Sequence, residues 1–338
     1  MSRTHGWFAA CLSVSALSLC AQVVQAQQYS LIELDVPAGV DSTRGLGING
    51  SDKVVGTSPG ASSGDNPTQW NGTIVTTLGL AGGISGAALA INDAGVVVGM
   101  TYIMLPNGGY ESRATMWNGG VATLLPTLGG TEGIALSINE LGQMVGWTVA
   151  SADPTSRAVI WDGATVTDLG PGTARDINNV GQVTGLSSLG ATLWNGTTAT
   201  ALSVAMEPVA INDAGAIIGN RDSRDPDTFQ WKTTARVWSE GTAVVLTGPT
   251  NYQFSTIARD INNAGQIVGY SENNYSMAVA TLWDGTSAIN LNTVLTPAQA
   301  LQIELTEATA INDLGYIVVN GYDSVAQQQR SYILAPIP

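Results

Sequence analysis

Cysteine and histidine are almost missing from this 338-residue sequence, which contains two Cys and one His. All three, His5, Cys11 and Cys20, lie within the first 20 residues. Without that segment the chain has no thiol that could form a disulfide or attack a substrate, and no imidazole that could act as a general base or bind a metal. The sequence therefore excludes Ser-His-Asp, Cys-His and zinc-dependent catalysis, and no catalytic residue or metal ligand is assigned.

Residues 1–26 have the features of a secretory signal peptide. A short polar start is followed by an apolar run from about Trp7 to Leu19, and Val24, Gln25 and Ala26 form a small-x-small cleavage site. We predict cleavage near Ala26 and secretion into the periplasm or the extracellular space. No later apolar stretch is long enough for a membrane helix, so no membrane span is expected.

Positive charge is also scarce. The only lysines are Lys53 and Lys232, and 26 Asp and Glu residues against 12 Lys and Arg residues give a net charge of −14. Such a chain repels phosphate backbones and anionic membrane surfaces, so we expect no nucleic-acid partner. Removing 26 of the 338 residues leaves 312, which is enough to bury a large core without disulfides.

What the sequence does contain is a repeat. INDAGVVVG at 91–99 returns as INDAGAIIG at 211–219 and as INNAGQIVG at 261–269. Seven copies align on the Asn that follows Ile, about 44 residues apart on average: Asn49, Asn92, Asn139, Asn178, Asn212, Asn262 and Asn312. Gly stands three positions later in six copies and seven positions later in six copies, with Asp52 and Val319 as the exceptions. The pattern predicts a strand, a tight turn and a second strand.

A Trp follows each of the first six copies, with a turn after it and a Leu eight positions later. The Trp residues are Trp70, Trp117, Trp161, Trp194, Trp238 and Trp283, and the Leu residues are Leu78, Leu125, Leu169, Leu202, Leu246 and Leu291. The turn contains Asn-Gly or Asp-Gly in five of the six. These dipeptides supply the positive φ angles of short hairpin turns, so each repeat is expected to hold four short strands.

A four-stranded unit of this size cannot bury both of its faces alone and must stack on its copies. The last repeat runs through INDLGYIVV and RSYILAP and then lacks a fourth strand, whereas YSLIELDVPAG near the start has the form of one, with Leu34 in the Leu position. We therefore predict an all-β fold, a single seven-bladed β-propeller of four-stranded blades over residues 27–338. The N-terminal strand would complete the C-terminal blade, as ring closure requires, and we expect a monomer.

Over residues 29–338 the sequence resembles the HAF family of extracellular repeat proteins, whose units run as A-x-x-I-N-x-x-G-x-V-V-G and end on an Ala-aromatic strand. It departs from that family because the His-Ala-Phe of the family name appears here as Arg113-Ala114-Thr115 or Arg157-Ala158-Val159. The resemblance implies an extracellular location and a β-propeller-like repeat architecture. It implies no particular chemistry.

The repeated residues each have a structural and a functional explanation. One Trp per repeat at a fixed position fits packing between blades, and the alternative is a set of platforms for sugar rings. The Ile-Asn-Asp/Asn steps fit hydrogen bonding within a turn, and the alternative is a calcium site. The two ARDIN segments place Arg175, Asp176, Arg259 and Asp260 on inner strands, where an ion pair within each blade is the simplest expectation.

The copies differ most in the links between their second and third strands, which vary from LSSLG at 186–190 to NRDSRDPDTFQWKTT at 220–234. Variable loops on a rigid scaffold are frequent binding sites, although the loops could also be tolerated insertions. The candidate ligand-binding residues are the aromatic and acidic residues of these links: Tyr102, Tyr110, Glu111, Trp147, Asp225, Asp227, Phe229, Trp231, Tyr270, Glu272 and Tyr275.

Three functions fit these features. The first is a secreted, non-enzymatic binding or surface module that holds a polysaccharide or a protein partner on the variable-loop side. The second is a carboxylate-based glycoside hydrolase or polysaccharide lyase, because carboxylates, Tyr and Arg are the catalytic groups that remain. The third adds calcium, bound by DSRDPD at 222–227; otherwise no cofactor is expected.

Overall fold

The computed structural model describes residues 28–60, 64–151, 153–226 and 229–337. The predicted signal peptide and Asp227 lie outside these residues. Within them, no helix is long and apolar enough to cross a membrane.

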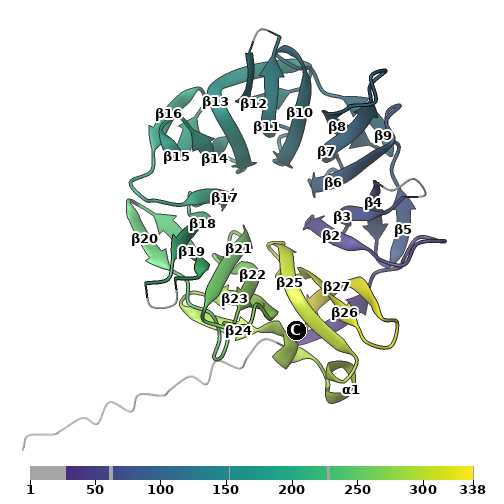
Figure 1. The fold of residues 1–338 in the computed structure, drawn as a ribbon, viewed down its shortest axis with the longest axis vertical. Helices are drawn as coiled ribbons and strands as arrows, with labels where there is room; N and C mark the ends of the chain where they lie inside the picture. Colours follow the sequence, from purple (N-terminus) through teal and green to yellow (C-terminus); the bar gives the residue numbers. More distant parts are fainter. Residues whose placement is uncertain (1–27, 61–63, 152, 227–228, 338) are drawn as a thin grey trace, which may run out of the picture.

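Nearly all of the regular structure is β-strand, as predicted, and the strands form sheets arranged in a ring (Figure 1). One four-stranded sheet contains β2 (Arg44–Ile48), β3 (Val54–Pro59), β4 (Asp65–Asn71) and β5 (Ile74–Thr77). The next contains β6 (Ser85–Ile91), β7 (Val97–Met104), β8 (Tyr110–Asn118) and β9 (Val121–Leu124). Further sheets contain β17 (Glu207–Ile211), β18 (Ile217–Arg224), β19 (Trp231–Ser239) and β20 (Thr242–Val245), and β21 (Ser255–Ile261), β22 (Ile267–Glu272), β23 (Ala278–Asp284) and β24 (Ser287–Asn290).

A seven-stranded sheet spans the third and fourth copies of the repeat. It contains β10 (Gly129–Ile138), β11 (Met144–Ala150), β12 (Asp153–Asp162), β13 (Thr165–Ile177), β14 (Gln182–Ser187), β15 (Gly190–Asn195) and β16 (Thr198–Ala201). The first part of β13 pairs with β12 and its last part pairs with β14. One long strand thus serves as the fourth strand of one copy and the first strand of the next.

The last sheet joins the two ends of the chain. It contains β25 (Ile303–Ile311), β26 (Ile317–Asp323), β27 (Gln328–Pro336) and, beside β27, β1 (Tyr29–Glu33). The predicted pairing of the N-terminal strand with the last strand is confirmed by a register that runs from Tyr29 opposite Pro336 to Glu33 opposite Tyr332. A 3-10 turn, η1 (Leu291–Val294), and a short helix, α1 (Pro297–Ala300), precede β25.

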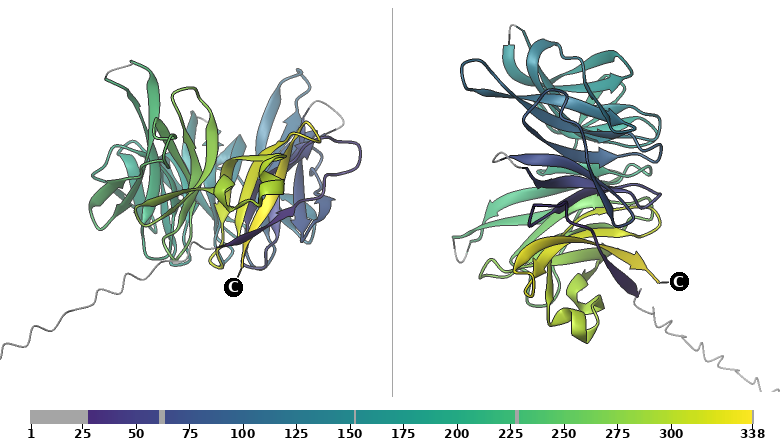
Figure 2. Two further views of the ribbon diagram at one scale, coloured as in Figure 1. Left: turned by 90° about the horizontal axis from the view of Figure 1, so that it is seen from below. Right: turned by 90° about the vertical axis from the view of Figure 1, so that its right-hand side faces the viewer.

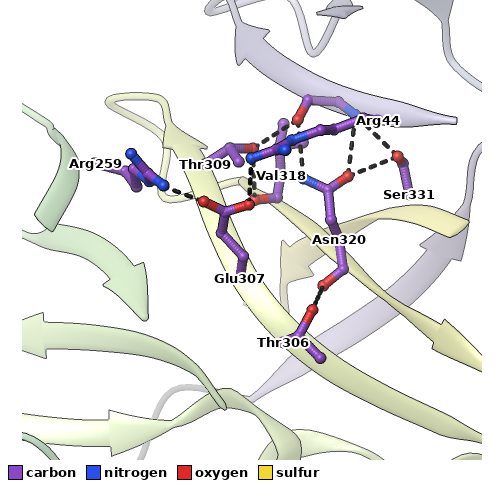
Figure 3. A network of polar contacts seen from close by, with 9 residues as sticks. Arg44, Arg259, Thr306, Glu307, Thr309, Val318, Asn320 and Ser331 are labelled. Atoms are coloured by element: carbon purple, nitrogen blue, oxygen red, sulfur yellow. Dashed lines mark hydrogen bonds and ion pairs between the residues drawn. The ribbon is translucent and has the colours of Figure 1, made fainter. Parts of the chain in front are cut away.

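The same sheet is also bonded to the first one, across the junction between residues far apart in sequence. Asn320 on β26 accepts from the backbone N–H of Gly45 and donates to its carbonyl, both at 3.0 Å (Figure 3). Ser331 on β27 accepts from the same N–H at 2.9 Å. These bonds fix the junction between the last and first sheets.

The same tight turn joins the first and second strands of every copy. The Gly three positions after the Asn has a positive φ, for example +80° at Gly95. In the copy that lacks this Gly, Asp52 takes its place with a φ of 59°. An Asp tolerates a positive φ better than most residues do. The predicted strand, turn and strand are therefore found in every copy.

Every first strand carries a β-bulge at one position of the repeat. In β6 the register shifts between Ala88 and Ala90, so Leu89 has no partner on β7. The residues skipped in this way are Leu46, Leu89, Leu136, Arg175, Val209, Arg259 and Thr309, each three positions before the repeated Asn. A bulge re-aims the side chain that it skips, and all seven of these residues line one cavity at the centre of the ring.

The repeated Trp residues lie between neighbouring sheets. Trp70, Trp117, Trp161, Trp194 and Trp283 are at most 1% exposed, whereas Trp238 is half-buried. Trp117 packs in one cluster with Leu78 of the preceding sheet, and its indole N–H donates to Gly79 O at 2.6 Å. Trp70, Trp161 and Trp283 make equivalent bonds to the residue after the preceding Leu. These contacts are those of a packing role.

Candidate functional site

The repeated Asn residues form a ring of hydrogen bonds around the centre of the molecule. Each Nδ2 donates to the backbone carbonyl of the Asn in the next copy, at 3.0 to 3.2 Å, and Asn312 closes the circle by donating to Asn49. Each Oδ1 accepts from the backbone N–H four residues further on, as Asn92 does from Val96. All seven side chains are buried. The Asn thus shapes its own turn and also bonds its copy to the next.

The residue after each Asn forms a second, exposed ring. Its side chain accepts from the backbone N–H of the preceding copy in six of seven cases: Asp93, Glu140, Asn179, Asp213, Asn263 and Asp313. These residues line a cavity of about 410 Å³ where the central channel opens. Partial burial raises the pKa of Glu140, and the charges of Asp93, Asp213 and Asp313 add to that rise. We call this side of the molecule, which carries the repeated Asn turns and the turns after the Trp residues, the turn face.

Two carboxyl groups lie deeper in the channel. Asp176 accepts from Ser137 Oγ and from the backbone N–H of Ile211 in the next copy, and Asp260 accepts from its neighbour Ile261 and from Ile311 in the next copy. Both residues are half-buried and line the cavity at the turn face as well as a second cavity further inside the channel. Burial raises the pKa of Asp176 and raises that of Asp260 to about 7, with the charge of Asp176 contributing to the latter.

The predicted ion pairs within the ARDIN segments are therefore wrong, although both segments do lie on inner strands. Arg175 pairs with Glu207, and Arg259 pairs with Glu307 at 2.8 Å. Each Glu belongs to the following copy of the repeat. The bulge at the Arg changes the direction of its side chain, and the first strands of adjacent copies lie close enough for the Arg to reach across.

The raised pKa of Asp260 gives the first testable prediction. Its folded-state pKa of about 7 lies above the ordinary value of 3.8, so the folded protein holds this proton more tightly than the unfolded chain does. The resulting stability is present at low pH and is lost as the pH rises toward 7. Lowering the pH from 8 to 5.5 should therefore increase the free energy of unfolding by up to about 2 kcal/mol, measured by urea denaturation.

The Asp260→Asn variant should lose most of this pH dependence, and Asp176 should account for what is left. Asp65→Asn, which changes an exposed carboxyl group on β4 outside the channel, is the matched control and should behave as the parent protein does. An Asp260→Asn variant with the parent pH dependence would contradict the assignment.

The opposite side of the molecule, which we call the loop face, carries the links between second and third strands and the links between copies. Its longer hairpins rise from one side of the ring (Figure 2). The sequence placed the candidate ligand-binding residues in the links between strands, but most of them lie on the strands themselves. Tyr102, Tyr110, Glu111, Trp147, Trp231, Tyr270 and Glu272 lie on strands, and only Asp225, Phe229 and Tyr275 lie between them.

The physical reason is that the variable links are extended hairpins. β18 and β19 pair without interruption from Ile217 opposite Trp238 to Arg224 opposite Trp231, so most of residues 220–234 is paired strand. Trp147 and Tyr270 are half-buried, whereas Trp231, Phe229 and Tyr275 are 69%, 69% and 86% exposed. Tyr110, at the start of β8, is 60% exposed, so the structure leaves four exposed aromatic candidates near hairpin tips.

One groove on the loop face brings two of the candidates together. It is lined by Asp225, Lys232, Asn251, Gln253, Phe254, Asn273, Asn274 and Tyr275, which come from two neighbouring hairpins and the link between their sheets. Lys232 forms an ion pair with Asp225 at 2.9 Å. Side chains alternate along a strand, so Trp231 faces away from Lys232 and therefore from this groove, with Arg224 over its ring at 5.9 Å. Sequence reasoning missed the four amide residues of the groove.

A second cavity, of about 260 Å³, lies where the central channel opens on the loop face. Its lining contains Arg44, Arg175 and Arg259, and Glu307 lies between Arg44 and Arg259 (Figure 3). None of the described cavities on the loop face has more than one carboxyl group in its lining.

Calcium binding by residues 222–227 stays a prediction. Asp222 accepts from Thr233 Oγ1 at 2.6 Å and Asp225 binds Lys232, while Asp227 is outside the described part of the chain. In that part, no group of three or more acidic side chains is placed to hold a metal ion.

No family model matches the chain, and no curated protein matches it. It is similar in structure to the β-propeller domain of the Trilobed protease from Pyrococcus furiosus, at 13% identity over 72% of this chain and 79% of that one, with a TM-score of 0.47. It is also similar to a gluconolactonase from Xanthomonas campestris (12% identity, 92% and 90% coverage, TM-score 0.41). A third similar structure is a putative oxidoreductase (glucose dehydrogenase) from Thermus thermophilus (11%, 90% and 99%, 0.43). The likeness concerns an all-β, propeller-like fold alone.

Proposed function

We propose that this chain is a secreted, HAF-type seven-bladed propeller that acts as a binding module for a neutral polysaccharide. Counting the seven-stranded sheet as two four-stranded blades that share β13 supports the number of blades, and the ring of seven Asn bonds supports closure. The net charge of −14 favours an uncharged polymer over a polyanion. The ligand lies in the loop-face groove between the β18–β19 and β22–β23 hairpins.

The side chains of this groove carry the proposal. Tyr275, which is 86% exposed, and Phe254 offer ring faces for the apolar side of a sugar. The four amides, together with Asp225 and Lys232, supply both donors and acceptors, as sugar hydroxyl groups require. Because Asp225 and Lys232 neutralise each other, the groove does not select a charged ligand.

The test is binding of a panel of neutral polysaccharides by the protein and by Tyr275→Ala. Removing an exposed aromatic contact from the centre of a binding site is expected to lower affinity at least about tenfold, measured by calorimetry. The melting temperature should stay unchanged because Tyr275 contributes little to the packed core.

Ile74→Ala is the matched control, since Ile74 is an apolar side chain of similar high exposure, 69%, at the start of β5 beside the turn that follows Trp70. It should bind as the parent protein does. Equal affinities for the Tyr275 and Ile74 variants would rule out this groove. A ligand that is lost only with Trp231→Ala would place binding on the other side of the β18–β19 hairpin. A panel in which only a protein binds would contradict the polysaccharide.

The alternative, a glycoside hydrolase or polysaccharide lyase, stays a prediction without assigned residues. Hydrolysis needs two carboxyl groups across one cleft, about 5 to 10 Å apart. The loop-face groove contributes Asp225 alone, and that carboxyl group is paired with Lys232.

A further inference from the structure

The loop-face mouth of the central channel gathers positive charge in an acidic protein. Arg44, Arg175 and Arg259 are three of the ten arginines in a chain of net charge −14, and they come from three different sheets. Glu307 is the only carboxyl group in the lining of this described cavity. Local charge at this mouth is therefore opposite in sign to that of the molecule and to that of the turn-face mouth.

Ion pairs hold these guanidinium groups in place. Glu307, whose side chain is 14% exposed, bonds Arg44 at 2.7 Å and Arg259 at 2.8 Å (Figure 3). Glu207 bonds Arg175. Arg259 is also placed over the ring of Tyr270, at 5.4 Å. Preorganised guanidinium groups lose little freedom when they bind an anion.

The same groups retain unused donors. A guanidinium has five N–H donors, and the described contacts of Arg44 and of Arg259 use one on each, both to Glu307. The Nε of Arg175 is buried and has no hydrogen-bond partner among the described residues. The Arg175 side chain as a whole is 38% exposed and its only described contact is the one from Nη2 to Glu207, so donors remain at its other nitrogen atoms.

Apart from Thr309, the rest of the cavity lining is apolar. Leu46, Leu89, Leu136 and Val209, all half-buried, are skipped by the bulges of their strands and line the cavity beside the arginines. The seven residues that the bulges direct into this cavity thus comprise four aliphatic residues, two arginines and one threonine. A molecule that fits has one end for guanidinium groups and another for aliphatic side chains.

We propose that this cavity binds a small carboxylic acid. Its carboxylate accepts hydrogen bonds from Arg175 and from Arg44 or Arg259, in the paired geometry that guanidinium and carboxylate groups favour. Its apolar part lies against the four aliphatic side chains. A volume of about 260 Å³ suits a single small molecule, and the acidic surface disfavours a polyanion. The site shares no lining residue with the groove proposed for polysaccharide, so each can fail independently.

Binding of hexanoate and of D-glucuronate is compared with that of their uncharged counterparts, hexanamide and D-glucose, by calorimetry and by methyl NMR of the leucines. We expect at least one carboxylate to bind at least tenfold more tightly than its counterpart and to shift Leu89 or Leu136 signals. Hexanoate alone would indicate an aliphatic acid as the source, and D-glucuronate alone a sugar acid. Failure of both carboxylates, or equal binding of the uncharged molecules, would overturn the proposal.

Arg175→Gln should weaken carboxylate binding at least tenfold. Arg157→Gln is the matched control. This variant also loses one ion pair, that between Arg157 and Asp168, but Arg157 lies on β12 and outside the cavity lining. Equal affinities for the two variants would also overturn the proposal. If Arg175→Gln does not fold, the comparison of charged and uncharged molecules with the unmodified protein decides alone.

Discussion

Replacing a single ring asparagine, Asn178→Ala, is expected to lower the free energy of unfolding by about 2 to 4 kcal/mol. The Asn178 side chain is 3% exposed and donates to the carbonyl of Asn212 at 3.0 Å. It also accepts from the backbone N–H of Gln182 at 2.8 Å. Alanine would leave that N–H without its partner and remove one of the two bonds that the Asn212 carbonyl accepts, the other coming from Gly215. Urea denaturation measures the loss.

The next residue offers a matched control. Asn179 is in the same turn and is also bonded to neighbouring copies, but its side chain is exposed to water. Water can replace those bonds, so Asn179→Ala should cost less than about 1 kcal/mol. Similar losses for the two variants would mean that the buried ring of bonds does not stabilise the assembly of copies.

The sequence predicted the turn at each repeated Asn but not the bond between copies. Asp and Asn both suit the turn, and the following position indeed varies among Gly, Asp, Glu and Asn. The repeated position itself, directly after the Ile, is Asn in all seven copies. Of Asp and Asn, only Asn has both an acceptor for its own turn and a donor for the next copy, so the strict choice of Asn was the signal that could have revealed the ring.

The charged residues of the channel were harder to predict. Arg175 and Asp176 are adjacent in sequence, and their partners, Glu207 and Ile211, lie more than 30 residues further on. These partners become neighbours only when copies stack side by side. The bulge that directs each Arg is a register shift between two strands, and the residue pattern of one strand does not contain it.

Most of the candidate binding residues lie on strands rather than in the links between them, because strand length was underestimated from the sequence. Repeat comparison ends each second strand where the copies stop resembling one another. Strand pairing depends on backbone hydrogen bonds and continues through residues of any type, as it does up to Arg224 and Trp231. Trp147 and Tyr270 consequently lie on the sheets. The groove residues Asn251, Gln253 and Phe254 come from the link between β20 and β21, which joins two copies and held none of the candidates.

The chain beginning at Leu34 is expected to melt roughly 10 °C lower than the chain beginning at Gln28 and to self-associate. It lacks β1, so all five residue pairs with β27 are lost. The edge of β27 would then present unpaired N–H and C=O groups, and Tyr29 and Leu31 would no longer cover the core around Tyr332 and Leu334. Differential scanning calorimetry and size-exclusion chromatography with light scattering measure the two effects.

A control must remove residues without exposing a strand edge. Residues 220–233 are unsuitable because the amide of Asn220 on β18 bonds the backbone of Ala258 in the next sheet through both its nitrogen and its oxygen. Replacing residues 105–109, the loop between β7 and β8, by Asn-Gly shortens the chain but keeps the hairpin paired. This variant should remain monomeric and melt within a few degrees of the parent protein. If the chain beginning at Leu34 behaved in the same way, β1 would be an accessory strand, and the bonds of Asn312 and Asn320 to the first sheet would have to hold the ring closed without it.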